Sequence, residues 1–309
     1  MKSLVFVLLL TTAAAQAQPQ TPPQPNCPPA IQPLSAEQGH APARDRGLLW
    51  KLQRDGRTSW LYGTLHLGRA AWAVPGPAVK AAFAASDVLA LEVDVSDPAT
   101  AAQMQTAMPA SPPLPPSLQA RLQERARRAC LSEGMLADAH PLLATATLAL
   151  LEARWEGLDA QFGQETLLAA AARQLGRPVV ALETVALQLS ALIPQDAAEA
   201  IAMTEKTLEQ LERDEVRPAT RRLARAWEQG NLPDLAAYES WCKCIHNAED
   251  RALFRRLNDE RNPALAEGID ALHRQGQRVF AAVGALHMSG PKALPLLLQR
   301  LGYRVQRFR

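Results

Sequence analysis

Two segments of the sequence share a residue spacing that could support acid–base or metal chemistry. Gly63 stands three positions before His66, and Gly284 stands three positions before His287. Each motif comes at the end of an apolar run of strand length. In open α/β sheets, ligands bind at the carboxyl ends of strands, where glycine allows the backbone or a ligand to approach closely. We therefore expect the two imidazoles to converge in one site.

A carboxylate and an arginine could complete this site. Glu92 follows the apolar run Val88–Leu91, and Asp94 lies two positions further, on the same face if the strand continues. Glu183 follows another apolar run, although it could equally begin the next helix. Arg261 could pair with Glu92 or stabilise an anionic transition state. These side chains are the expected partners of the histidines.

Each candidate also has a purely structural explanation. Pro263 disfavours helix at Asn262, so Asn262 is expected to be the N-cap of a helix whose first residue is Pro263. In the structural explanation of Glu92 and Asp94, these carboxylates face water or cap a helix after the strand ends. A lone histidine at a strand end is more often a hydrogen-bonded structural residue than a catalyst. The matched pair of Gly-x-x-His motifs is what favours a functional site.

Strand-length apolar runs alternate with long helical stretches, which favours an α/β fold with a mixed sheet. Asp55-Gly56 separates two of these runs and predicts a β-hairpin. The pattern between about residues 117 and 275 is mostly helical, and we expect part of it to be an insertion covering one side of the sheet. The predicted strands are residues 48–54, 58–67, 87–95, 177–182, 278–287 and 303–308.

The first residues have the layout of a secretory signal peptide. Lys2 is followed by the apolar run Leu4–Leu10 and by Ala15-Gln16-Ala17, a small-x-small cleavage site. The apolar run is too short to span a membrane, and no later stretch approaches the length needed. We therefore expect a signal peptide at 1–17, a linker rich in proline and glutamine at 18–45, an α/β domain at 46–309, and a periplasmic or secreted protein.

Charge and cysteine content indicate which partner and which disulfides to expect. The chain has 33 basic and 31 acidic residues with no concentrated basic block, which argues against nucleic acid as its partner. In an oxidising compartment, four cysteines predict up to two disulfides. A direct Cys242–Cys244 bond would close a very small, strained ring. We therefore expect at least one of these two to pair with Cys27 or Cys130.

Five segments in this order resemble the TraB/PrgY/GumN family, which is related to the Tiki metalloproteases and more distantly to erythromycin esterases. They are LLWKLQRDGRTSWLYGTLHLG, DVLALEVD, RPVVALET, RNPALAEGI and VFAAVGALHMSGPKALPLLLQRLGYRV. The resemblance covers about residues 45–309 and matches the central helical region only loosely. The family's two Gly-x-x-His motifs, strand-end glutamate and Arg-Asn pair correspond to Gly63 and His66, Gly284 and His287, Glu92, and Arg261 with Asn262.

The resemblance implies a hydrolase acting on a peptide or another amide or ester. Its Tiki-like members suggest a divalent metal held by His66, His287 and Glu92, with zinc, manganese and cobalt all conceivable; such an ion lowers the pKa of bound water to about 7. Its esterase-like members suggest a metal-free site in which a histidine, oriented by Glu92, is the general base and Arg261 stabilises the oxyanion. Two other classes stay open: a protein that sequesters a peptide or haem without turnover, and a structural envelope protein.

Overall fold

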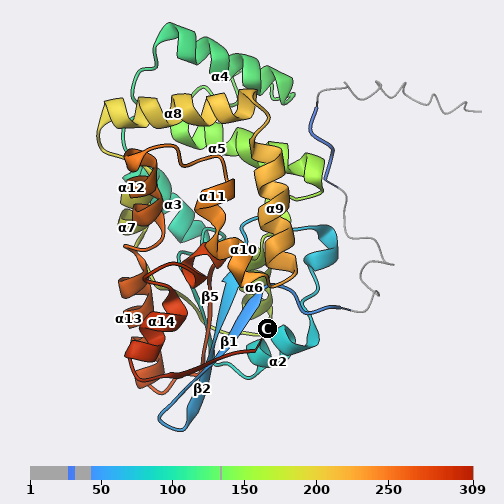
Figure 1. Cartoon of the computed structure of the whole chain (residues 1–309), viewed down its shortest axis with the longest axis vertical. Coiled ribbons are helices and arrows are strands. Elements are labelled where there is room, and N and C mark those ends of the chain that lie inside the picture. Colours follow the sequence, from blue (N-terminus) through green and yellow to red (C-terminus); the bar gives the residue numbers. More distant parts are fainter. Residues whose placement is uncertain (1–26, 32–42, 133, 309) are drawn as a thin grey trace, which may run out of the picture.

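A computed structural model of the chain describes residues 27–31, 43–132 and 134–308 (Figure 1). The predicted signal peptide lies outside these residues, as does most of the predicted linker. Among the described residues, no helix combines the length and the apolar character that crossing a bilayer requires.

The centre of the fold is a mixed sheet of six strands in the order β4-β3-β5-β2-β1-β6. The four strands from β4 to β2 are parallel, whereas β1 and β6 run antiparallel to their neighbours. The predicted α/β fold with a mixed sheet is confirmed, and the last strand lies at one edge of the sheet. The strands are β1 (Leu48–Arg54), β2 (Arg57–Thr64), β3 (Val88–Leu91), β4 (Val179–Ala181), β5 (Val279–Gly284) and β6 (Arg304–Arg307).

The predicted hairpin joins β1 to β2. Asp55 and Gly56 both have positive φ, 50° and 71°, as the two central residues of a type I′ turn require. β2 is shorter than expected and ends at Thr64. The backbone N–H and C=O of Leu65 instead bond to Gln164, to its side chain at 3.0 Å and to its N–H at 3.1 Å. This exchange of partners turns the chain away from the sheet just before His66.

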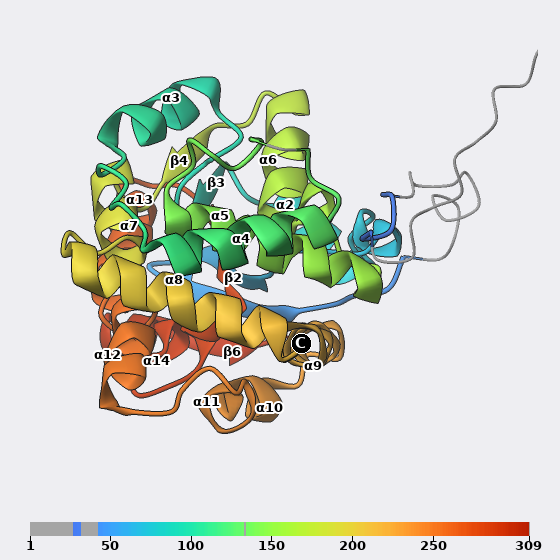
Figure 2. The ribbon, with the colours of Figure 1, turned by 90° about the horizontal axis from the view of Figure 1, so that it is seen from above.

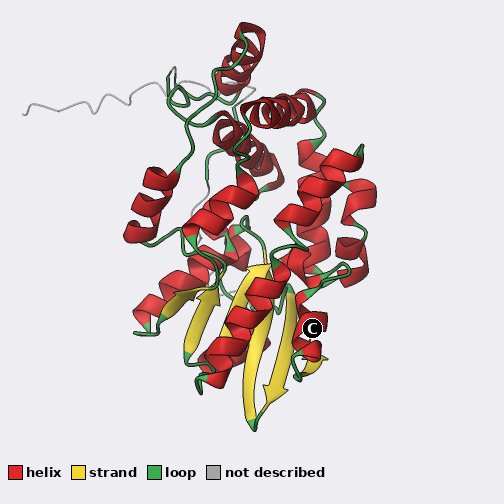
Figure 3. Ribbon diagram, turned by 90° about the vertical axis from the view of Figure 1, so that its left-hand side faces the viewer, coloured by secondary structure: helices red, strands yellow, loops and turns green. Residues whose placement is uncertain are grey.

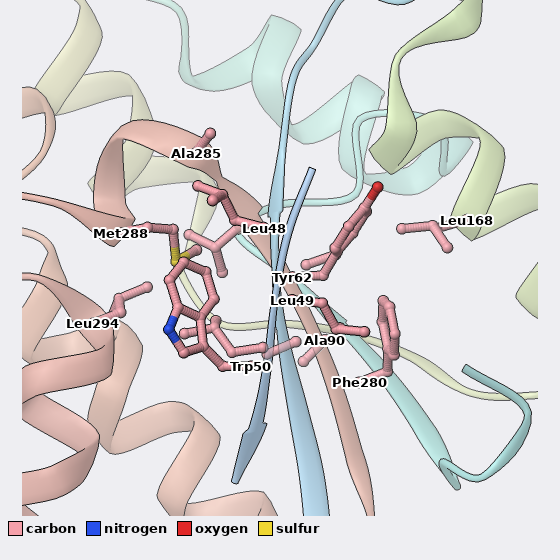
Figure 4. Close-up of a cluster of buried hydrophobic side chains, with 14 of the residues drawn as sticks. Leu48, Leu49, Trp50, Tyr62, Ala90, Leu168, Phe280, Ala285, Met288 and Leu294 are labelled. Atoms are coloured by element: carbon pink, nitrogen blue, oxygen red, sulfur yellow. The ribbon is translucent and has the colours of Figure 1, made fainter. Parts of the chain in front are cut away.

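Helices cover both faces of the sheet, so its central strands are fully buried. Figure 4 shows Tyr62, Phe280 and Leu168 on one face, and Trp50, Met288 and Leu294 on the other. The first face carries α2 (Pro77–Ala84) and α6 (Gln164–Gln174), and the second carries α13 (Asn262–Arg274) and α14 (Leu294–Arg300). Burial on both faces explains why the parallel strands read as continuous apolar runs rather than as alternating patterns.

Part of the central helical region forms a second, smaller core. It consists of α4 (Pro116–Arg128), α5 (Pro141–Glu152) and α8 (Ala197–Glu212), which lie side by side beyond the end of the sheet (Figures 1 and 2). Leu122, Leu148 and Leu208 are among the side chains buried between these helices. In Figure 3 the arrowheads of the central parallel strands point towards this helical layer. The layer therefore stands over the edge at which those strands end.

The remaining helices connect these two parts. The sequence patterns did not indicate the helix at Pro98–Ala107, which is α3. The other elements are η1 (Ala70–Trp72), α3 (Pro98–Ala107), η2 (Ala153–Glu156), η3 (Ala160–Phe162), α7 (Val185–Leu192), α9 (Val216–Glu228), α10 (Leu232–Ala236), α11 (Tyr238–Trp241), α12 (Ala248–Leu257) and η4 (Ala285–Met288).

The disulfides differ from the expectation. Cys27 pairs with Cys130, and Cys242 pairs directly with Cys244. Lys243 between the latter two adopts a left-handed conformation with φ of 54°, and the two Cα atoms lie 5.1 Å apart. The prediction that Cys242 or Cys244 reaches Cys27 or Cys130 was wrong, because this turn brings the two neighbouring thiols together.

Candidate functional site

Four adjacent parallel strands end at one edge of the sheet, and each is followed closely by an ionisable residue. Glu183 follows β4, Glu92 follows β3, His287 follows β5 and His66 follows β2. The strand ends are in register, with Leu91 opposite both Ala181 and Ala282, and with Thr64 opposite Gly284. Sheet topology thus brings together four side chains that are far apart in the sequence.

Arg261, at the start of α13, joins the two glutamates. Its Nε lies 2.9 Å and 3.2 Å from the carboxylate oxygens of Glu183, and its Nη2 contacts Glu183 and lies 2.5 Å from Glu92 Oε2. Its Nη1 donates to the Leu257 carbonyl at 2.9 Å. The side chain of Glu183 is 0% exposed and that of Arg261 is 8% exposed. Arg261 therefore neutralises and fixes two buried carboxylates, and most of its donors are already engaged.

Glu92 is held as a carboxylate with one oxygen directed at His287. Its Oε1 accepts a hydrogen bond from Gly284 N–H at 2.7 Å and lies 3.8 Å from His287 Nε2. Burial by itself would raise the pKa of Glu92, but the interactions with His287, Arg261 and His66 outweigh it and lower this pKa to about 2. Glu92 is thus a carboxylate near pH 7.

The glycine of each motif makes room for the site. A Cβ on Gly284 would lie 3.2 Å from Glu92 Oε1 and 3.5 Å from His287 Cδ2. A Cβ on Gly63 would lie 3.1 Å from Met288 Cγ, so Gly63 lets η4 pack against β2. Gly284 therefore leaves room for the carboxylate of Glu92, and Gly63 leaves room for the turn that carries His287.

His287 has a defined tautomer. Its Nδ1 lies 2.6 Å from Asn262 Oδ1, while Asn262 Nδ2 donates to the carbonyls of His287 at 3.3 Å and Lys292 at 2.8 Å. Because the amide nitrogen serves these two carbonyls, its oxygen is the acceptor and the imidazole proton sits on Nδ1. Burial lowers the pKa of His287 to about 4. The ring is therefore neutral near pH 7, with the lone pair of Nε2 facing Glu92 and Arg261.

The expected role of Asn262 as a helix cap was wrong. Arg261 occupies the N-cap position, and Asn262 is the first residue of α13. Its side chain points away from the helix end, because the carbonyls of η4 and of the following turn offer its amide better partners. Pro263 stands within the first helical turn, as its missing N–H allows.

His66 has a different environment. Its side chain is 71% exposed, and its Nδ1 lies 3.1 Å from Oε1 of the largely buried Glu165. Thr64 Oγ1 donates to the same oxygen at 2.5 Å. The charge of Glu165 outweighs desolvation and raises the pKa of His66, and the charges of Glu92 and Arg261 also act on it. His66 thus belongs to the same electrostatic cluster but favours the imidazolium form.

Sequence reasoning missed Glu165, and the structure gives Asp94 partners other than those of Glu92. Glu165 lies in the first turn of α6. The one local sign of its contact with His66 is the nearby Gly163, because a Cβ added at that position would lie 2.6 Å from the His66 carbonyl oxygen. Asp94 instead contacts Arg173 and accepts from Ser96 Oγ at 2.6 Å. β3 ends at Leu91, so the argument that placed Asp94 on the face of Glu92 does not apply.

Part of the expected metal-ligand set is in place. Glu92 Oε1 and His287 Nε2, 3.8 Å apart, could both contact one small ion, but Oε2 of Glu92 is bound to Arg261 and His66 Nδ1 faces Glu165. Within the described parts of the chain, no three or more His, Cys, Asp or Glu side chains are grouped to hold a metal. The three expected ligands are therefore not grouped around one point in this structure.

Comparison with protein families matches residues 48–307 to the model of the TraB/PrgY/gumN family. The chain belongs to this family. Comparison with curated proteins finds no match, and comparison with solved structures finds none either. The family match spans the whole sheet, from the first strand to the last, and so includes every residue of the cluster described above.

Proposed function

We propose that this TraB/PrgY/GumN family member is an exported hydrolase of amide or ester bonds, with peptides as the expected substrates. One observation carries the proposal: two histidines at one sheet edge have surroundings that drive their pKa values in opposite directions, Glu165 beside His66 and an apolar site with Asn262 around His287. Asn262 and burial keep His287 neutral, whereas Glu165 favours protonated His66. Paired groups whose pKa values are driven apart supply a general base and a general acid at the same pH.

In the proposed reaction, His287 activates a water molecule. Glu92 Oε1 and His287 Nε2 are both acceptors, and their separation of 3.8 Å allows one water to donate to each. The water oxygen attacks the substrate carbonyl while its proton passes to Nε2. Glu92 then stabilises the imidazolium that forms, and Arg261 holds Glu92 in place. Arg261 is thus a positioning residue in this proposal rather than a donor to the oxyanion.

His66 is the proposed general acid. Its exposed ring can reach a bound substrate, and Glu165 orients it through Nδ1, leaving Nε2 to donate a proton to the departing amine or alcohol. The proton that His287 takes from water returns to solvent after product release, and solvent reprotonates His66. Both histidines are thereby restored for the next turnover.

A metal-dependent hydrolase is the second candidate, and one feature favours it. The hydrogen bond from His287 Nδ1 to Asn262 Oδ1 is the kind of outer contact that orients metal-bound histidines. In that case zinc, manganese or cobalt would be held by His287 and Glu92, with His66 as the third ligand, and would supply the acidified water.

Mass spectrometry of a defined peptide mixture incubated with the protein tests the proposal. Cleavage products are expected from the wild type, and their loss is expected in both His66→Ala and His287→Ala. His246→Ala is the control, because His246 is exposed and lies outside the cluster. Peptides that are retained but returned intact would indicate a sequestering protein instead. Removing metal with a chelator and restoring manganese, zinc or cobalt separates the two hydrolase candidates.

A further inference from the structure

A hollow lies between the sheet and helices α2 and α6. Its volume is about 360 Å³, within the range of pockets that bind small molecules. None of His66, Glu92, Arg261 and His287 lines it. Figure 4 shows Tyr62 and Leu168 on the face of the sheet where it lies. The hollow is therefore a separate structural feature that the proposed hydrolytic site does not use.

The interior of this hollow is apolar. Tyr62, Trp72, Phe83, Leu167, Leu168 and Trp227 supply most of its wall. The indole N–H of Trp72 donates to Glu228 at 3.0 Å, and that of Trp227 donates to the Gly63 carbonyl at 2.6 Å. The wall therefore presents ring faces and methyl groups to an occupant, because these polar groups are engaged elsewhere.

The other polar groups of the wall are also satisfied by the protein. Tyr62 O–H donates to the Arg46 carbonyl at 3.1 Å. The side chain of Gln164 accepts from Leu65 N–H at 3.0 Å and donates to the Phe162 carbonyl at 3.2 Å. An occupant that placed its own hydrogen-bonding groups deep in the hollow would leave them unsatisfied, which is costly. The occupant must therefore be apolar along the part that enters.

The rim of the hollow is positively charged. Arg44, Arg46 and Lys80 are among its lining residues, and none of the described residues that line it is acidic. Arg46 lies 3.4 Å from Glu228, whereas no ion pair joins Arg44 or Lys80 to another described residue. Both of these side chains are exposed and are available to a ligand. The polar end of the occupant is therefore expected to be an anion.

We propose that this hollow binds a single-chain amphipathic anion, with an alkyl or acyl tail inside and a carboxylate or phosphate head at Arg44 and Lys80. The apolar wall favours an alkyl or acyl tail, and Arg44 and Lys80, which form no ion pair with another described residue, favour an anionic head. A volume near the lower end of the small-molecule range suits one tail rather than a two-chain lipid. The proposal goes beyond the hydrolytic function and is independent of it.

Calorimetric titration with four single-chain probes, each below its critical micelle concentration, tests the proposal. The probes are dodecanoate, lysophosphatidylglycerol, dodecanol and dodecyltrimethylammonium. Dodecanoate is expected to bind with an affinity at least about tenfold above that of dodecanol, with no measurable binding of the cation. Tighter binding of lysophosphatidylglycerol than of dodecanoate would identify a phospholipid head as the source, and the reverse would identify a free fatty acid. Equal binding of the anion and the alcohol would overturn the assignment of an anionic head.

Charge-reversal and cavity-filling variants locate the site. The double variant Arg44→Glu/Lys80→Glu is expected to weaken dodecanoate binding at least about tenfold. Arg300→Glu/Arg304→Glu makes the same change in net charge at exposed positions elsewhere and should leave binding unchanged. Ala171→Phe places a ring in the hollow and should abolish binding of the tail, while His287→Ala should bind dodecanoate as well as the wild type does. Unchanged affinity in both Arg44→Glu/Lys80→Glu and Ala171→Phe would overturn the proposal.

Discussion

Asn262 Oδ1 lies 2.6 Å from His287 Nδ1, and this contact fixes which nitrogen of the imidazole carries the proton and which carries the lone pair. The amide cannot reverse without losing its bonds to the carbonyls of His287 and Lys292. The residue beside Arg261 thereby controls the chemistry of a histidine on a different element, η4.

Asn262→Asp should move the acidic limb of the pH–rate profile to higher pH. A carboxylate can still accept from Nδ1, but its charge stabilises the imidazolium and raises the pKa of His287 from its depressed value of about 4. A nearby charge of this kind shifts a pKa by about 1–3 units. Because the general base is inactive when protonated, activity should then be lost at a higher pH on acidification. The pH dependence of kcat/KM for both proteins gives the answer, and coincident acidic limbs would contradict the assigned role.

Glu165→Gln should move the basic limb of the same profile to lower pH. Glu165 raises the pKa of His66 to about 9, and without its charge the pKa falls back towards the ordinary 6.5. The general acid then loses its proton earlier as the pH rises. A raised pKa in the folded state also implies that this pair contributes stability below about pH 6.5, which is lost as the pH approaches about 9. Measured at pH 6 and pH 9, the free energy of unfolding should differ less in Glu165→Gln than in the wild type.

Glu183→Gln should destabilise the fold strongly. Glu183 is completely buried against Arg261, and neutralising it leaves part of a buried positive charge without a partner. Breaking such a pair costs about 3–5 kcal/mol. Urea titration measures this change. Glu124→Gln is the control, since Glu124 pairs with Arg127 and Arg128 on the surface of α4, where ion pairs contribute little. Equal stability of the two variants would show that the buried pair is unimportant.

Gly284→Ala should reduce activity far more than stability. Gly284 has a φ of −48°, which alanine tolerates, but the new methyl group would press on Glu92 Oε1 at 3.2 Å and on His287 Cδ2 at 3.5 Å. A displacement of reacting groups by about 1 Å can cost about a hundredfold in rate. Gly63→Ala is the matched variant, because its main contact is the flexible side chain of Met288. A comparison of kcat/KM with melting temperature separates the two effects, and an equal loss of rate in both variants would argue against this explanation.

Much of the site could be read from the sequence because it lies at strand ends. The apolar runs before Glu92, Glu183 and His287 located the strands, and the parallel α/β pattern predicted that their carboxyl ends meet. The hairpin at Asp55-Gly56 followed from the two residue types that tolerate a left-handed conformation. These inferences depend on short-range patterns whose physical cause is local.

Three features could not be read in this way. Glu165 reaches His66 from a helix that is distant in the sequence, so their pairing depends on where α6 packs. Asn262 fits the local rules for a helix cap, and its contact with His287 is tertiary, so the local sequence gives no sign of it. The Cys242–Cys244 bond depends on the left-handed turn at Lys243, a conformation that lysine rarely adopts.

The order of strands in the sheet has a consequence for folding. β5, which carries the Gly284 motif, lies between β3 and β2 although nearly two hundred residues of chain precede it after β3. Until that late segment emerges and inserts, the two flanking strands have no common neighbour and His66 has no counterpart. A partly synthesised chain therefore holds no assembled pair of histidines, and the cluster can form only once the last part of the domain is in place.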